Sequence, residues 1–231
     1  MKVLLISGTD HKGSTYSIGR ILAEKLTGNE NISEVFLPRD FGEFCCGCTN
    51  CFLKNETECP HYAKLRPITE LIDSSDVLIF TTPTYVYHAS GQMKALLDHY
   101  GWRWMVHRPE EKMFRKQAVV ISTAAGKGMS SAIKDVADSC FFWGIPCVYK
   151  YGKAVMETRW SHVRPEIKRS IEAKTDSLAE KIRRRDGRTR VPFKTRGLFF
   201  IMSLLQRKGF NEADRNYWNE KGWTKGGRPW R

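Results

Sequence analysis

No part of this chain restricts its possible folds more than its first sixteen residues, MKVLLISGTDHKGSTY. The apolar run Val3–Ile6 contains no polar alternation and ends at Ser7-Gly8-Thr9, and a helical pattern starts after a polar loop. An unbroken apolar run of this length is typical of a strand that is buried on both faces, as in a parallel sheet. We therefore predict an α/β protein in which the first strand turns directly into the first helix.

The turn after this strand has the groups that bind a phosphate. A helix start leaves free backbone N–H groups, which attract an anion together with the helix dipole. Side chains of the turn can add hydroxyl donors or positive charge, and they are Ser7, Thr9, Ser14, Thr15, His11 and Lys12. Such residues also occur at helix starts only as caps, and the turn lacks both GxGxxG and GxxxxGK. The turn alone is therefore a weak indication.

The order of strand and then helix repeats five times along the chain. The expected strands span residues 3–6, 33–37, 76–82, 118–123 and 145–151. With right-handed crossovers, this order predicts a doubly wound parallel sheet with helices on both faces. Ligands of such sheets bind beyond the carboxyl ends of the strands, which three loops leave here, at residues 7–16, 83–90 and 124–129. All three loops are rich in Gly, Ser, Thr or aromatic residues.

The second and third of these loops can hold a flat aromatic ligand. Tyr85 and Tyr87 can supply ring faces, and the backbone N–H groups from Thr84 to Tyr87 can reach the polar edge of a ring. The turn at residues 124–126 can do the same from the other side. Tyrosines that only cover the end of a sheet are the alternative interpretation.

The segment PTYVYHASGQMKALLDH resembles the flavin-contacting segment of the NAD(P)H-dependent FMN reductase family, which has a flavodoxin-like fold. The residues that match the family pattern are Pro83, Tyr85, Ser90, Gly91, Lys94 and Asp98. The first loop is similar to the phosphate loop of that family at Gly13, Ser14 and Thr15, and the resemblance covers about residues 1–155. It implies a five-stranded sheet in the order 2-1-3-4-5 and bound FMN. The phosphate would lie in the first loop and the isoalloxazine ring between the second and third.

The resemblance thus gives a set of residues expected to bind FMN. They are Ser7, Thr9, His11, Gly13, Ser14, Thr15, Tyr16, Pro83, Thr84, Tyr85, Val86, Tyr87, Ala124, Ala125 and Gly126. One departure is that the family commonly has Ser-x-Arg where this chain has Gly8-Thr9-Asp10, so His11 or Lys12 would have to supply the missing positive charge. No residue is expected to act as a general acid or base, because hydride transfer to a flavin does not require one.

Five of the seven cysteines lie in a loop at residues 41–64 that has no clear periodicity. Four of them have the compact spacing of a 4Fe–4S site, which must place one thiolate on each iron. They are Cys45, Cys48, Cys51 and Cys59. This spacing resembles that of the iron–sulfur flavoproteins, a branch of the same family. Cys46 makes the first ligand ambiguous, and a zinc site or a loop without metal are the alternatives.

The apolar runs and the cysteines predict the cellular compartment of the protein. No apolar run is long enough to cross a bilayer, and Val3–Ile6 is too short for the apolar core of a signal peptide. We therefore expect a cytoplasmic, reducing compartment, where cysteines are more often metal ligands or buried thiols than disulfides. Cys140 and Cys147 lie on apolar faces and are expected in the core.

We predict a domain at residues 1–158 and a helical, basic C-terminal extension at residues 159–231. A helix is expected over residues 161–185, and the pattern beyond Gly187 is irregular. The net charge is +13, and Lys181–Arg231 holds 15 Lys and Arg against 4 Asp and Glu. We favour a solvated face or an oligomer contact for this segment over an interfacial amphipathic helix. Asp98, His99 and the run Trp102-Arg103-Trp104 could line the pocket above the ring or form a dimer contact, and we favour the contact.

These features predict an FMN-dependent oxidoreductase or electron-transfer flavoprotein, in which the flavin performs the chemistry and the protein positions it. Electrons would come from NAD(P)H, or from ferredoxin if a cluster is present, and would pass to a small-molecule acceptor. We expect a homodimer or homotetramer without nucleic-acid contacts. The alternative function is a flavodoxin-like binding scaffold whose basic tail contacts nucleic acid, a membrane or an acidic partner. That alternative leaves the three loops unexplained.

Overall fold

The computed structural model of the chain describes residues 1–209 and 211–230. Within them, five strands form one parallel sheet in the order β2-β1-β3-β4-β5, which confirms the expected topology. The strands are β1 Val3–Ser7, β2 Ile32–Phe36, β3 Val77–Pro83, β4 Gln117–Ala124 and β5 Cys147–Ala154.

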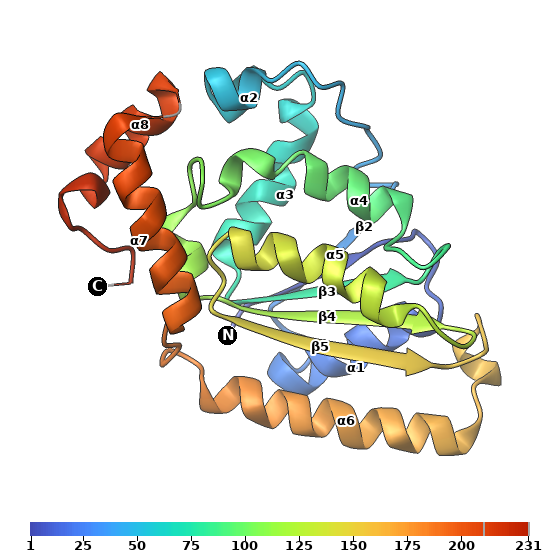
Figure 1. Ribbon diagram of the computed structural model, residues 1–231. Coiled ribbons are helices and arrows are strands. Elements are labelled where there is room, and N and C mark those ends of the chain that lie inside the picture. Colours follow the sequence, from blue (N-terminus) through green and yellow to red (C-terminus); the bar gives the residue numbers. More distant parts are fainter. Residues whose placement is uncertain (210, 231) are drawn as a thin grey trace.

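Helices connect the strands and continue the chain beyond them. The α-helices are α1 Ser14–Thr27, α2 Asn50–Leu53, α3 Tyr62–Ser74, α4 Gly91–Asp98, α5 Met129–Phe142, α6 Pro165–Arg184, α7 Phe193–Lys208 and α8 Glu212–Glu220. Short 3-10 helices are η1 Glu56–Glu58, η2 Gly101–Arg103, η3 Glu111–Arg115, η4 Trp160–His162 and η5 Trp223–Lys225. In Figure 1, α1 and α6 cover one face of the sheet, and α3, α4 and α5 cover the other. This three-layer α/β architecture is the flavodoxin-like fold that the sequence predicts.

Alternate residues of each central strand supply the two core layers. In β1, Leu4 and Ile6 pack on the side of α3, α4 and α5, whereas Val3 and Leu5 pack on the side of α1 and α6. All four side chains are at most 1% exposed. Because both faces of the strand are buried, every position is apolar, and this explains the unbroken run in the sequence.

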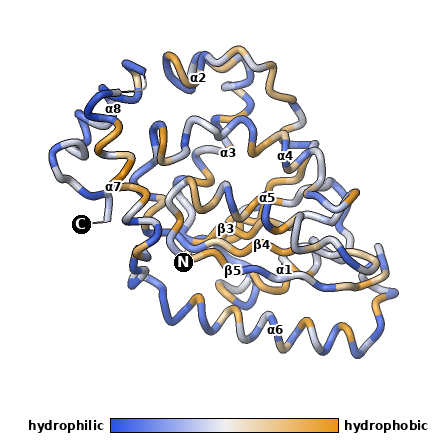
Figure 2. The backbone as a smooth tube through the Cα atoms, in the orientation of Figure 1, coloured by the Kyte–Doolittle hydropathy of each residue, from blue (hydrophilic) through white to orange (hydrophobic). Residues whose placement is uncertain are grey.

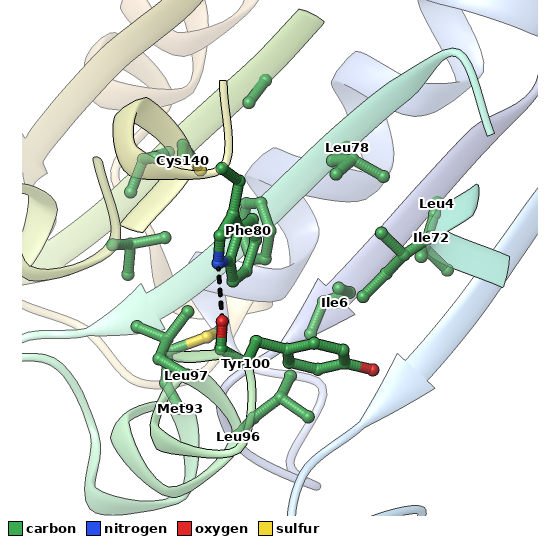
Figure 3. Packing of buried hydrophobic residues seen from close by; sticks show 14 of the residues in the cluster. Leu4, Ile6, Ile72, Leu78, Phe80, Met93, Leu96, Leu97, Tyr100 and Cys140 are labelled. Carbon is green, nitrogen blue, oxygen red and sulfur yellow. Dashed lines mark hydrogen bonds between the residues drawn. The ribbon is translucent and has the colours of Figure 1, made fainter. Parts of the chain in front are cut away.

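Aliphatic side chains and a few aromatic ones fill the core layer between the sheet and the helices α4 and α5 (Figure 3). Trp143 packs against Phe80 and Tyr100, and its Nε1 donates a hydrogen bond of 3.2 Å to the carbonyl of Tyr100. Cys140 is fully buried in this layer, as predicted. The prediction for Cys147 is wrong, because the residue begins the edge strand β5 and is only half-buried.

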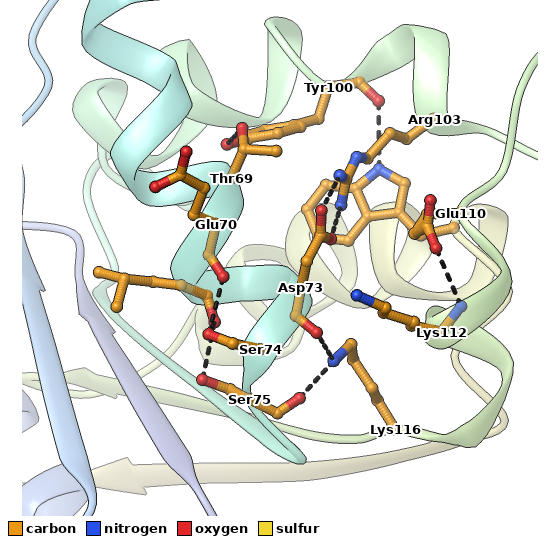
Figure 4. Close-up of polar contacts among 12 residues, drawn as sticks. Thr69, Glu70, Asp73, Ser74, Ser75, Tyr100, Arg103, Glu110, Lys112 and Lys116 are labelled. Carbon is orange, nitrogen blue, oxygen red and sulfur yellow. Dashed lines mark hydrogen bonds and ion pairs between the residues drawn. The ribbon is translucent and has the colours of Figure 1, made fainter.

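Trp102 and Arg103, interpreted above as part of a dimer contact, are instead buried within the chain. Arg103 donates hydrogen bonds of 2.7 and 2.8 Å to the carboxylate of Asp73 in α3 (Figure 4). Lys116 donates to the backbone carbonyls of Asp73 and Ser75, and burial lowers the pKa of Lys116 to about 8. These contacts lie before β3 and β4, at the amino edge of the sheet, opposite the edge where the predicted loops meet.

The segment after Gly187, expected to be irregular, forms the two helices α7 and α8. They pack on the side of the domain (Figure 1) through a third apolar cluster. It consists of Met105, Phe114, Phe199, Trp218 and Trp223. The apolar periodicity of α7 is weak because three of its four buried residues are polar. Among the described residues, no helix is long and apolar enough to cross a bilayer. The division of the chain after residue 158 stays a prediction.

Candidate functional site

A pocket of about 240 Å³ opens at the carboxyl edge of the sheet, where the loops after β1, β3, β4 and β5 meet. Most of the residues expected to bind the cofactor line it. They are Thr9, His11, Gly13, Ser14, Thr15, Tyr16, Pro83, Thr84, Tyr85, Ala124 and Ala125. The three loops singled out in the sequence therefore lie together around one cavity.

Four of the expected residues do not line this pocket. Ser7 is buried at the end of β1, with 2% of its surface exposed. Val86 and Tyr87 project into solvent and are 94% and 61% exposed. Tyr87 and Gly126 instead line a second, shallower cavity beside α5.

A fourth loop, after β5, also lines the pocket and was missed in the sequence. It contributes Met156, Glu157 and Thr158. The carbonyl of Thr158 accepts a 3.1 Å hydrogen bond from the N–H of Ser14, and that of Glu157 accepts one of 2.8 Å from Ser14 Oγ. The rule that parallel strands end at one edge would have identified this loop, because β5 is a strand of the same sheet.

The first turn of α1 offers free donors to an anion. Among the described residues, no acceptor is found for the backbone N–H groups of Thr15 and Tyr16. Such groups point out of the helix start, and the helix dipole adds positive potential there. Gly13 precedes them, and a Cβ at this position would lie 2.8 Å from the carbonyl oxygen of Thr158. Only glycine therefore fits the turn without displacing the neighbouring loop.

Positive charge is sparse at this end of the pocket. Of the two cations expected to compensate for the missing arginine, only His11 lines the cavity. The ammonium of Lys12 lies 5.4 Å from the ring centroid of Tyr16. Asp10 forms an ion pair of 3.3 Å with Arg39. Backbone N–H groups and hydroxyl groups must therefore provide most of the attraction for an anion.

The loop after β3 is a tight turn with strained backbone. The N–H of Tyr85 donates to the carbonyl of His88 and the N–H of His88 to that of Tyr85, both at 2.9 Å. Val86 and Tyr87 between them have φ angles of 48° and 67°, which non-glycine residues adopt at a cost. Their N–H groups have no partner within the described residues, so they can donate to the polar edge of a ligand.

The cysteine loop forms a second candidate site beside α3 and α8. Cys45, Cys46 and Cys48 are exposed, whereas Cys51 and Cys59 are half-buried. Burial and the neighbouring thiols of Cys59, Cys45 and Cys48 raise the pKa of Cys51 to about 11. The four predicted ligands thus lie close enough to influence one another electrostatically.

One end of this loop faces two histidines. The ligand atoms of Cys59, His61 and His99 lie within 4.8 Å of one another, and no other set of three does so in the part of the chain that the structure describes. His61 Nδ1 lies 2.9 Å from His99 Nε2, and His99 Nδ1 lies 2.8 Å from the carbonyl of Ala95. Burial lowers the pKa of His99. Sequence reasoning missed this pair because His99 lies far from the loop along the chain.

The sequence profile of NADPH-dependent FMN reductases matches residues 1–156 of this chain. An iron–sulfur flavoprotein of Archaeoglobus fulgidus is 26% identical over 132 residues, which cover 55% of this chain and 57% of the relative. A second iron–sulfur flavoprotein of that organism is 26% identical over 99 residues, which cover 42% of this chain and 48% of the relative. The matches span about half the length of these curated relatives.

Solved structures share the fold at low identity. An NAD(P)H:quinone oxidoreductase from Methanothermobacter marburgensis superposes with a TM-score of 0.61 and 14% identity, covering 79% of this chain and 97% of the other. An FMN-dependent NADH-azoreductase from Bacillus anthracis, in complex with FMN, superposes with a TM-score of 0.58 and 12% identity, covering 78% of this chain and 99% of the other. At such identities the likeness shows the fold alone.

Proposed function

The chain belongs to the NADPH-dependent FMN reductase family, and from this premise we propose that it is an oxidoreductase whose pocket at the carboxyl edge of the sheet binds FMN. The observation that carries the proposal is the convergence of four loops on one cavity, at one end of which the backbone N–H groups of Thr15 and Tyr16 have no partner among the described residues. The N–H groups of Val86 and Tyr87, in the loop after β3 beside the cavity, are also without partners there.

Different residues around the cavity would bind the phosphate and the ring of FMN. The N–H groups of Thr15 and Tyr16 and the imidazole of His11 would bind the phosphate. The N–H groups of Val86 and Tyr87 would hold the polar edge of the ring, which Tyr85 would cover. The bound flavin would accept a hydride or single electrons, and the protein would orient it and limit the access of water.

The loop after β5 competes for one of the phosphate donors. Both the N–H and the hydroxyl of Ser14 are engaged by carbonyls of Glu157 and Thr158. Ser14 can bind the phosphate only if this loop moves. We therefore assign the primary contacts to Thr15 and Tyr16, whose N–H groups need no movement of the loop after β5.

We further propose a 4Fe–4S cluster in the cysteine loop, held by Cys45, Cys48, Cys51 and Cys59. A zinc site usually takes its ligands from two separated pairs. The compact spacing of the loop cysteines along the chain supports a cluster instead, in which each thiolate binds a different iron.

The Cys59, His61 and His99 group is the competing arrangement, because it has the close spacing of a site for a single transition metal. Metal and sulfide analysis of protein purified without oxygen separates the two. A cluster requires about four irons and four sulfides per chain and its loss in Cys48→Ala but not in His61→Ala. One metal ion without sulfide, lost in His61→Ala and retained in Cys48→Ala, would overturn the cluster proposal.

Electron flow completes the proposed function. We propose NAD(P)H as the donor, a small molecule such as a quinone or free flavin as the acceptor, and ferredoxin as the partner of a cluster-containing form. A homodimer or homotetramer in the cytoplasm stays our expectation. Anaerobic oxidation of NADPH and NADH, measured with and without FMN, tests the assignment. FMN-dependent oxidation supports it, and a fully FMN-loaded protein inert to both nucleotides would refute the NAD(P)H step.

A further inference from the structure

Helix α7 buries a mixed face, with polar and apolar residues, against the protein. Its buried residues include Thr195, Ser203 and Gln206, which are at most 2% exposed. Ser203 donates a hydrogen bond of 2.8 Å to the carbonyl of Trp223, and Gln206 Nε2 donates one of 2.7 Å to the carbonyl of Val106. Phe199 is buried on the same side, where Leu198 and Met202 are partly buried against its cluster. A helix that only packs on a domain normally buries its apolar face, so α7 departs from the usual arrangement.

The outward side of α7 is apolar along its length. Its exposed apolar residues are Phe193 (87%), Phe200 (49%), Ile201 (51%), Leu204 (41%) and Leu205 (41%). They recur at the spacing of one helical face, with the side-chain-free Gly197 between them. Figure 1 places α7 at the periphery of the molecule, and Figure 2 shows hydrophobic residues along it. Exposed apolar side chains in such a continuous row mark an interaction surface.

The charged residues of α7 and of its flanking segments have one sign. Residues 187–211 contain six Lys and Arg and no Asp or Glu. Lys194 lies at the start of α7 and Lys208 at its end, and Arg196 and Arg207 flank the apolar residues. A second copy of the chain packed on this face by twofold symmetry would bring these cations together, which costs free energy.

We propose that the outward face of α7 lies on the surface of a membrane that contains anionic lipids. Phe, Leu and Ile side chains flanked by Lys and Arg are typical of a helix that inserts into the interface without spanning the bilayer. The apolar residues would enter the boundary between headgroups and acyl chains, and the flanking cations would pair with lipid phosphates. Such binding would place the reductase next to membrane-dissolved acceptors of electrons. It does not depend on the proposed flavin or metal sites.

Sedimentation with vesicles of 70% phosphatidylcholine and 30% phosphatidylserine tests the proposal on the full chain as purified. We expect binding to these vesicles in 0.1 M NaCl, at least tenfold weaker binding in 0.5 M NaCl, and little binding to pure phosphatidylcholine. Lys194→Gln with Lys208→Gln should weaken binding by about fivefold per charge. Phe200→Ser with Leu204→Ser should weaken it by about tenfold or more.

Matched controls are exposed residues of the same kinds elsewhere. Lys174→Gln on α6 and Leu53→Ser on α2 should bind vesicles as the wild type does. Absence of wild-type binding to anionic vesicles would overturn the proposal whether or not the variants fold. Two further results would do so: unchanged binding in the α7 variants, or a dimer in gel filtration that Phe200→Ser with Leu204→Ser converts to monomer. Binding of an acidic protein through α7 without vesicle binding would also assign the face to a protein partner.

Discussion

Replacement of Gly13 by alanine tests the phosphate end of the flavin pocket. An added Cβ would lie 2.2 Å from Cε1 of His11, 2.7 Å from its Nδ1 and 2.8 Å from the carbonyl oxygen of Thr158. The imidazole can rotate away, but the Thr158 carbonyl is backbone and must shift. The φ and ψ angles of −85° and −164° suit alanine, so the whole effect comes from these contacts.

The cost of this overlap sets the expected loss of affinity. Overpacking by one methyl typically costs about 1–3 kcal/mol. If the phosphate needs the present positions of His11 and the first turn of α1, this cost weakens FMN binding by about 5- to 150-fold. Riboflavin has no phosphate, so its affinity should change much less.

Quenching of flavin fluorescence, titrated with the flavin-free protein, measures both affinities. Gly197→Ala is the matched control, because its added Cβ meets no atom within 4 Å. Thermal unfolding shows whether each variant remains folded. If Gly13→Ala is folded and binds FMN as the wild type does, or loses riboflavin affinity equally, the phosphate does not lie at this turn.

Three further outcomes follow from side-chain contacts and burial within the chain. Asp214 is fully buried with Arg108, so Asp214→Asn should leave an uncompensated guanidinium and reduce the free energy of unfolding by about 3–5 kcal/mol. This loss corresponds to a fall in Tm of roughly 6–20 °C. Asp138→Asn, which removes a charge from an exposed ion pair, is the control and should change Tm by less than about 2 °C. Equal shifts in Tm for the two variants would contradict the view that the buried pair stabilises the fold more than the exposed one. Cys48→Ala should remove the broad iron–sulfur absorption and keep the flavin bands, and loss of both would show that the loop shapes the flavin pocket. Burial lowers the pKa of Lys116 to about 8, whereas a lysine in the unfolded chain has a pKa of about 10.4. Between these two pH values the unfolded chain therefore binds more protons than the folded chain. The Tm of the wild type relative to Lys116→Met should therefore rise from pH 8 to pH 10, and a relative fall would contradict this reasoning.

The strands and the three predicted loops could be found from the sequence because their causes are local. Val3–Ile6 is apolar since both faces of β1 are buried, and each strand is followed by its own loop at the carboxyl edge. The helix α7 could not be found in this way, because its inward face mixes polar and apolar residues and several apolar ones face outwards. Its sequence therefore has only weak apolar periodicity, and the segment was expected to be irregular.

Contacts between distant parts of the chain were the other source of error. From the sequence Arg103 is expected at the surface because it is charged. It is buried because the packing of α3 places Asp73 beside it. His99 meets Cys59 and His61 only because α4 ends against the cysteine loop. The contacts of Ser14 with Glu157 and Thr158 likewise join the loop after the first strand to the loop after the last strand. The spacing of residues along a single sequence does not show which distant residues come into contact in the fold.

The visible absorption spectrum of the chain purified without oxygen, followed by identification of the released cofactor, tests the flavin site most directly. We expect twin flavin bands that bleach on reduction and about one FMN released per chain. A colourless protein that takes up no FMN when the nucleotide is added in excess would contradict the assignment of the pocket.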